Sequence, residues 1–211
     1  MQGIYLVTDT AACLGKPLNT VVADAVRAGA ACVQLREKQA STRVFLEKAQ
    51  ELKAVLKPSG IPLIINDRVD IALAAGAAGV HLGQSDMPCD HARDILGPGA
   101  IVGLSVETWK DVEAAEKLDV DYLGVSPVFP TPTKTDTREP WGLDGLHRIS
   151  TYSRHLLVAI GGIDHSNAAT VLSAGAHGLA VVSAICSAEN VFAATRGLVR
   201  IYDQVRAKKE G

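Results

Sequence analysis

Eight short runs of strand-forming residues recur along the chain, and segments with helical periodicity lie between them. The runs are apolar almost throughout, which is typical of parallel strands covered by helices. Eight such units in 211 residues leave little room for a doubly wound sheet with a separate domain. We therefore predict an α/β chain that forms a single (β/α)₈ TIM barrel over residues 1–211, with an open sheet as the alternative. The runs occupy residues 4–8, 32–36, 62–65, 79–82, 101–105, 122–125, 156–160 and 178–182.

Three segments repeat one junction between a helix and the following strand. They cover residues 28–35, 75–82 and 174–181, and each has an Ala-Gly-Ala sequence at its start. Glycine adopts the left-handed conformation that ends a helix at little cost, so the chain can turn there into a strand. The repeat favours the reuse of one helix–strand unit. No Gly-x-Gly-x-x-Gly follows the first strand run, which argues against a dinucleotide site.

The charge balance excludes a strong general attraction to polyanions. The chain has 21 basic and 23 acidic residues and a net charge of -2, so we expect neither nucleic acid nor an anionic membrane as a partner. No apolar run approaches the roughly 20 residues that span a bilayer, and the first residues lack the basic region of a leader. We expect a cytoplasmic protein that binds small anions at a local site. The sequence leaves a homo-oligomer open.

The cysteines and histidines suggest neither a structural metal nor a nucleophile. Cys13, Cys32, Cys89 and Cys186 are far apart, without a Cys-x-x-Cys pair or histidines at zinc-ligand spacing, so we predict buried, reduced thiols. His81 lies within a strand run and is interpreted as a packed, hydrogen-bonded residue. No pattern of nucleophile, histidine and acid emerges.

Polar residues collect at the carboxyl ends of the predicted strands, which is the catalytic face of such barrels. Long βα connections at that face often carry binding residues, and residues 126–141 form one with four of the nine prolines. We predict that this loop is a lid or binding loop over a site at this rim; the alternative is a variable surface excursion. The residues of the site are Gln34, Arg36, Lys38, Asn66, Asp67, Asp86, Ser105, Thr131, Thr133, Lys134, Gly161, Gly162, Val182 and Ser183.

Two carboxylates at this rim favour a magnesium site. Asp67 and Asp86 are 19 residues apart and follow neighbouring strand runs. Mg²⁺ commonly uses one or two carboxylates together with water and the oxygens of a diphosphate. The alternative is that Asp67 pairs with Arg68 or caps the helix that begins near Val69.

Cationic and glycine residues indicate two separate anion sites. Gln34, Arg36 and Lys38 share one strand parity, and guanidinium and ammonium groups bind phosphate oxygens. The alternative is a salt bridge to Glu37 or to another nearby acid. Gly161-Gly162 and the turn after strand eight lie where barrels often bind a phosphate. We expect a diphosphate with metal on one side and a monophosphate on the other.

Several motifs, in order along nearly the whole chain, resemble those of the thiamine phosphate synthase family. They are residues 34–38 (Gln-Leu-Arg-Glu-Lys), 66–68 (Asn-Asp-Arg), 79–86, 129–134 (Phe-Pro-Thr-Pro-Thr-Lys), 159–163 and 180–183. The resemblance implies a barrel enzyme that joins the diphosphate of 4-amino-5-hydroxymethyl-2-methylpyrimidine to a thiazole phosphate and releases pyrophosphate. Ser126 and the pair Val106-Glu107 depart from the family pattern and put only local loop geometry in doubt.

The resemblance also implies a role for each matching residue. The metal ligands for Mg²⁺ are Asp67 and Asp86, and the catalytic set is Arg36, Lys38, Lys134 and Ser105. The pyrimidine diphosphate would be held by Gln34, Leu35, Arg36, Glu37, Lys38, Asn66, Ser105 and Lys134. The thiazole phosphate would be held by Thr131, Pro132, Thr133, Gly162, Val182 and Ser183.

The expected chemistry is an alkyl transfer that needs charge neutralisation rather than a protein nucleophile. The family is expected to ionise the pyrimidine substrate first, which gives a methylene cation stabilised by the amino-pyrimidine ring. A closed loop would keep water from this cation. Two other functions stay open. One is a thiazole tautomerase-like barrel, which should not need the Pro-Thr-Pro-Thr-Lys loop, and the other is a catalytically silent sensor of thiamine phosphate. A phosphate-binding epimerase or aldolase is a more distant alternative.

Overall fold

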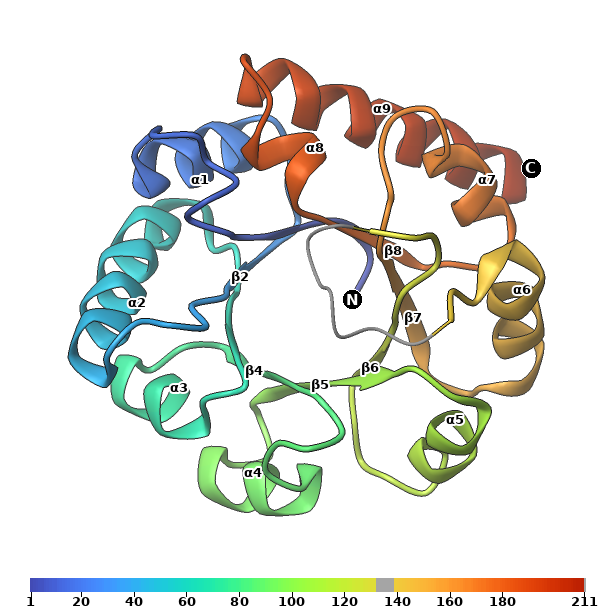
Figure 1. Ribbon diagram of the computed structural model, residues 1–211, viewed down its shortest axis with the longest axis horizontal. Coiled ribbons are helices and arrows are strands. Elements are labelled where there is room, and N and C mark those ends of the chain that lie inside the picture. Colours follow the sequence, from blue (N-terminus) through green and yellow to red (C-terminus); the bar gives the residue numbers. More distant parts are fainter. Residues whose placement is uncertain (132–138, 211) are drawn as a thin grey trace.

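The computed structural model describes residues 1–131 and 139–210 and contains a closed barrel of eight parallel strands (Figure 1). Each strand pairs with the next, and β1 pairs with β8, which closes the sheet. The predicted fold class is therefore confirmed. The strands are β1 (Gly3–Val7), β2 (Cys32–Leu35), β3 (Leu63–Asn66), β4 (Gly79–Leu82), β5 (Ile101–Val106), β6 (Tyr122–Val125), β7 (Leu156–Ile160) and β8 (Gly178–Val181).

Helices form a ring around the strands, as Figure 1 shows in a view along the barrel. The last long helix, α9, packs between α1 and α7 and contacts β1 and the short α8. The helices are α1 (Leu18–Arg27), α2 (Thr42–Leu56), the 3₁₀ turn η1 (Lys57–Ser59), α3 (Val69–Ala75), α4 (Cys89–Leu96), α5 (Trp109–Ala115), α6 (Gly142–Tyr152), α7 (Ala168–Ser173), α8 (Ser183–Cys186) and α9 (Val191–Glu210).

The three helix–strand junctions have the positive φ angles that their glycines predict. Gly29, Gly76 and Gly175 have φ angles of 106°, 58° and 116°, in the region that disfavours side chains. At Gly175 a Cβ atom would also lie 2.3 Å from Cβ of Ser150 in α6, so the junction has no space for one. The repeated Ala-Gly-Ala sequence thus places a glycine with positive φ at the end of three helices. Gly76 is itself the C-cap of α3, whereas Gly29 and Gly175 follow the alanine C-caps of α1 and α7.

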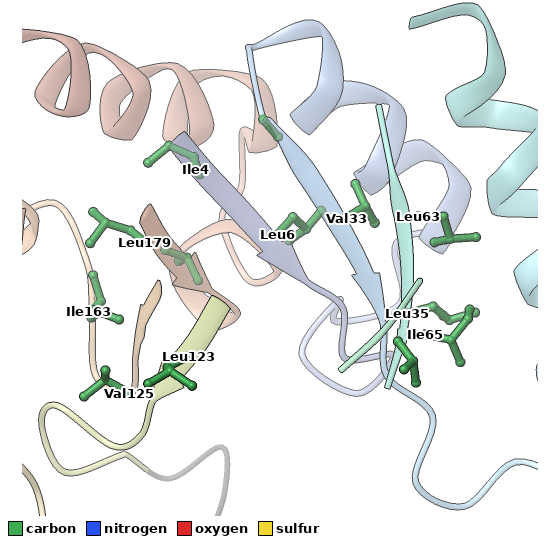
Figure 2. Packing of buried hydrophobic residues seen from close by; sticks show 14 of the residues in the cluster. Ile4, Leu6, Val33, Leu35, Leu63, Ile65, Leu123, Val125, Ile163 and Leu179 are labelled. Carbon is green, nitrogen blue, oxygen red and sulfur yellow. The ribbon is translucent and has the colours of Figure 1, made fainter. Parts of the chain in front are cut away.

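The core has two layers because alternate residues of each strand face opposite sides. One layer fills the space between barrel and helices and includes Ile4, Leu6 and Leu35, which Figure 2 shows projecting from their strands toward the helices. The other layer fills the barrel interior, and it includes Tyr5 and Tyr122. The interior layer forms a solid base on which a site at the carboxyl rim can rest.

All four cysteines lie within the described residues, and all are buried free thiols, as predicted. Burial raises the pKa of Cys32 and of Cys186 to about 12 and that of Cys89 to about 11. The thiolate is the reactive form, so iodoacetamide at about pH 8 is expected to leave the folded chain unmodified. Mass spectrometry should find label on all four cysteines only after unfolding in urea. Rapid labelling of Cys32 in the folded chain would contradict the burial.

Across residues 1–131 and 139–210, no helix has the length and apolar character needed to cross a membrane.

Candidate active site

A cavity of about 550 Å³ opens at the carboxyl ends of the strands. Among the residues predicted for the site, twelve line this cavity and so come together in space. These residues are Gln34, Arg36, Lys38, Asn66, Asp67, Asp86, Ser105, Thr131, Gly161, Gly162, Val182 and Ser183. Leu35 and Glu37 are not part of the described lining, and Pro132, Thr133 and Lys134 lie outside the described residues.

A chain of hydrogen bonds crosses the floor of the cavity. The amide of Gln34 on β2 donates to the Tyr5 hydroxyl over 2.8 Å, and the Tyr5 and Tyr122 hydroxyls lie 2.9 Å apart. His81 Nδ1 lies 3.0 Å from the Tyr122 hydroxyl, and His81 Nε2 lies 2.9 Å from the Ser105 hydroxyl. Five strands thereby contribute one connected polar surface inside the barrel.

The aromatic rings of this floor are fixed by packing as well as by hydrogen bonds. The His81 ring stacks on Tyr122 with 5.5 Å between centroids, and Tyr5 meets Tyr122 edge to face at 6.0 Å. Burial raises the pKa of Tyr5 and Tyr122 well above the ordinary value, so both phenols stay protonated at neutral pH. The floor therefore presents neutral donors and acceptors on rigid supports.

The cationic side chains Arg36 and Lys38 line the cavity on the side of β2. Arg36 Nη1 lies 3.3 Å from Asp9 Oδ2, and Lys38 Nζ lies 2.7 Å from Asp67 Oδ2. Gln34, Arg36 and Lys38 all line the cavity while Leu35 is buried in the outer core, although only Gln34 lies within β2. Neither cation pairs with Glu37, but each forms a salt bridge with another acid, as the alternative interpretation expected.

The two carboxylates predicted to bind metal lie next to one another. Asp67 has a φ of 64°, a conformation that asparagine and aspartate adopt more easily than most residues. Its helix-capping alternative is not found, since Arg68 is the N-cap of α3 and pairs with Asp70 instead. Asp86, after β4, accepts a 2.7 Å hydrogen bond from the Gly83 amide.

Burial raises the pKa of Asp86, the Gly83 amide lowers it, and the neighbouring Asp67 charge raises it further; the net shift is upward. Two neighbouring carboxylates repel one another when both are charged, and a bound cation would relieve that repulsion. Within the described residues, no group of three or more His, Cys, Asp or Glu side chains is placed to hold a metal. Two hard oxygen donors and an open cavity fit Mg²⁺, which completes its coordination with water and substrate oxygens.

On the opposite side of the cavity, glycines bring the backbone close to the space above β7. Gly161 and Gly162 have φ angles of 103° and 64°. A Cβ atom at Gly162 would lie 2.8 Å from Cβ of Phe129 and 2.8 Å from the Pro130 carbonyl oxygen. Only glycine fits here, and the turn at Val182 and Ser183 follows the neighbouring strand β8. Together they make a concave backbone surface of the kind that binds phosphate.

Sequence reasoning missed several cavity residues. Tyr5 in the middle of β1 and Tyr122 at the start of β6 were not singled out, and His81 was interpreted only as a packed residue. His81 is hydrogen-bonded as predicted, but it also lines the cavity. A signal was present, because a tyrosine in an otherwise apolar strand must find a partner for its buried hydroxyl. Asp9, the partner of Arg36, had no such signal.

Comparisons with known proteins agree on one family. A family model described as thiamine monophosphate synthase matches residues 4–185. The chain is 57% identical over 202 residues to a thiamine-phosphate synthase of Albidiferax ferrireducens, which covers 96% of this chain and 92% of that one. It is 49% identical over 200 residues to a thiamine-phosphate synthase of Vibrio parahaemolyticus, covering 95% and 98% of the two chains.

A solved structure is similar over the same length. Thiamine phosphate pyrophosphorylase from Pyrococcus furiosus superposes with a TM-score of 0.89 at 40% sequence identity. The match covers 97% of this chain and 96% of that chain. The similarity therefore extends through the barrel and the loops that carry the cavity.

Proposed function

Since the chain belongs to the thiamine monophosphate synthase family, its activity is thiamine-phosphate synthesis, and we propose how its residues divide that transferase reaction. The cavity takes 4-amino-5-hydroxymethyl-2-methylpyrimidine diphosphate and a thiazole phosphate, in the carboxythiazole or hydroxyethylthiazole form. It joins them into thiamine phosphate and releases pyrophosphate. The observation that carries this proposal is one cavity with cations and paired carboxylates on one side and a glycine-lined concavity on the other.

The diphosphate binds on the side of β2 and β3. Arg36 and Lys38 supply positive charge there. Asp67 and Asp86 would hold Mg²⁺, which would supply further charge neutralisation for the leaving group. Lys38, which pairs with Asp67 in the structure, would then contact the diphosphate oxygens. Asn66 and, from the loop outside the described residues, Lys134 complete this subsite.

The pyrimidine ring lies on the cavity floor. Its amino group and ring nitrogens need neutral donors and acceptors, which Gln34, Ser105 and the buried tyrosines provide. Tyr5, Tyr122 and Gln34 of the floor are buried, so their hydrogen bonds would fix the orientation of the ring. That orientation directs the methylene carbon toward the space above β7.

The thiazole phosphate binds at the backbone of Gly162, Val182 and Ser183, beside Thr131 and with Pro132 and Thr133 of the loop. The thiazole nitrogen then faces the methylene carbon. The carbon–oxygen bond to the diphosphate breaks first, and the cation is stabilised by the amino-pyrimidine ring. The nitrogen lone pair forms the new carbon–nitrogen bond, so no protein nucleophile is required.

We also propose the domain organisation, the partners and the cellular compartment of the chain. Residues 1–211 act as one catalytic domain whose partners are its small-molecule substrates. The cytoplasm is the proposed compartment, because four reduced cysteines suit a reducing environment.

The reaction is tested by mixing the purified chain with both substrates and Mg²⁺ and following thiamine phosphate by its oxidation to fluorescent thiochrome. Product is expected only when both substrates are present, and EDTA is expected to abolish it because the leaving pyrophosphate then lacks neutralisation. Added Mg²⁺ should restore the rate. Full activity in EDTA would contradict the metal assignment alone.

The same assay separates the alternatives. Isomerisation of the thiazole phosphate without coupling would indicate a tautomerase. Tight binding of thiamine phosphate without either activity would indicate a sensor.

A further inference from the structure

The segment that carries the cationic residues Arg36 and Lys38 has no regular secondary structure. Strand β2 ends at Leu35 and helix α2 begins at Thr42, so residues 36–41 are outside the sheet and its hydrogen-bond ladder. Side chains that bind a diphosphate must be held in place by other contacts, because loss of position costs much of the binding advantage. The contacts that hold this segment come from the loop after β1 and from α2.

Glu37, between the two cations, has its carboxylate in a different network. Its side chain is only 10% exposed, and Oε1 accepts hydrogen bonds of 2.7 Å from Lys48 Nζ and 2.7 Å from Thr10 Oγ1. Lys48 Nζ also lies 3.3 Å from Thr10 Oγ1. The three polar groups thus form a closed triangle in which each contacts both others.

This triangle joins three separate parts of the fold. Glu37 belongs to the segment after β2, Lys48 to the second turn of α2, and Thr10 to the loop after β1. A carboxylate with so little exposure needs its cation nearby, since an unpaired charge in that place is costly. The pair therefore fixes the backbone at residue 37 against the rigid helix.

Neighbouring contacts carry this constraint to Arg36. The Arg36 amide donates to Thr8 Oγ1 over 3.1 Å, and its guanidinium pairs with Asp9, which precedes Thr10. Asp9 is itself held by the Ala12 amide at 2.9 Å. The backbone amide and the guanidinium of Arg36 thus both contact the loop after β1, which Thr10 joins to Glu37.

We propose that Lys48 is a positioning residue for the diphosphate subsite, acting through Glu37 and Thr10 to hold Arg36 and Lys38 at the cavity. None of Lys48, Glu37 and Thr10 belongs to the described lining of the cavity, so their effect on substrate is indirect. The inference rests on the proposed function in that the cavity side of β2 receives the diphosphate. It assigns Glu37 to support of the segment instead of substrate contact.

The test compares Lys48→Met with Lys53→Met. Both lysines lie on α2, and Lys53 donates a 3.0 Å hydrogen bond to the Ala75 carbonyl, away from the cavity lining. Lys48→Met is expected to raise the KM for the pyrimidine diphosphate by about tenfold and to leave the KM for the thiazole phosphate within about twofold. Calorimetry should show a similar loss in affinity for magnesium pyrophosphate. Lys53→Met should change neither.

Two further variants cover the case in which Lys48→Met unfolds. Lys48→Arg keeps the charge and is expected to retain most of the affinity, and Thr10→Val removes one side of the triangle without leaving a carboxylate unpaired. Thr10→Val should raise the same KM selectively, by a smaller factor. Equal KM values for the wild type and for every folded variant would overturn the proposal, and so would equal rises for the two substrates.

Failure of the proposed function gives a different result. In that case the wild-type chain itself would not bind magnesium pyrophosphate or form thiamine phosphate. If the wild type does both and the Lys48 and Thr10 variants match it, only the positioning role is refuted.

Discussion

Replacing Asp86 with asparagine is expected to lower kcat/KM for thiamine-phosphate formation by about a hundredfold to a thousandfold. Asparagine keeps an oxygen that can accept the hydrogen bond from the Gly83 amide, so the loop after β4 should retain its shape. What is lost is one of the two negative charges proposed to hold Mg²⁺ beside the diphosphate. The measurement is the thiochrome assay over a range of Mg²⁺ concentrations.

Asp90→Asn is the matched control, because Asp90 lies in the first turn of α4, exposed and outside the cavity lining. It should behave like the wild type. An Asp86→Asn variant with full activity at low Mg²⁺ would show that this carboxylate does not bind the metal.

The Asp86→Asn substitution should not reduce the stability of the chain in the absence of Mg²⁺. The pKa of Asp86 is raised above its ordinary value of 3.8. A raised pKa means that the fold disfavours the charged form of Asp86. The group therefore stabilises the fold fully below pH 3.8, and this stabilisation is lost as the pH rises through the pKa of the folded state. Asparagine cannot ionise and avoids that loss. Thermal unfolding in EDTA at neutral pH should give a Tm at or above that of the wild type.

Mg²⁺ is expected to raise the Tm of the wild type but not that of Asp86→Asn, since a ligand stabilises the state that binds it. A lower Tm for the variant in EDTA would contradict the unfavourable burial of the Asp86 charge.

Gly103→Ala is expected to damage both the barrel and the reaction. A Cβ atom at Gly103 on β5 would lie 2.2 Å from Cζ and 2.4 Å from the hydroxyl oxygen of Tyr122. Tyr122 is fully buried and cannot move away, because Tyr5 and His81 hold its hydroxyl from two sides. We expect a loss of about 1–3 kcal/mol in the free energy of unfolding, measured in urea.

The activity of Gly103→Ala should fall by about a hundredfold, because displacement of Tyr122 misplaces the floor on which the pyrimidine ring lies. Gly99→Ala is the control: it lies in the turn before β5, and a Cβ atom there would meet nothing within 4 Å. Its stability and activity should match the wild type. A Gly103→Ala variant that folds and reacts normally would show that the floor adapts more easily than its packing indicates.

The position of the rim residues could be predicted because the strands are parallel. The carboxyl ends of all strands meet at one end of a barrel, so Asp67, Asp86 and Ser105 had to share a rim once the alternation of runs was recognised. The cavity-facing side of Gln34 likewise follows from the two-residue repeat of a strand. Arg36 and Lys38 lie beyond the end of β2, so that repeat does not determine their positions. The comparisons then supplied the family that the motifs had suggested.

The pairing of side chains could not be predicted in this way. Arg36 pairs with Asp9 and Glu37 with Lys48, although several acids and bases are nearer in the sequence. These choices depend on the relative height of neighbouring loops and on the direction of each side chain. Strand β2 ends at Leu35, and a shift of that end by one residue would change which side chains pair.

By itself, the sequence determined the fold class and the rim on which the chemistry collects, because both depend on periodicity and on glycine at fixed positions. The tertiary structure decided what lies beneath that rim. Tyr5 and Tyr122 are 117 residues apart, and their hydroxyls meet only because closure of the barrel brings β1 and β6 to face each other across its interior. Distances across a closed sheet depend on strand number and register together, and no local pattern contains them.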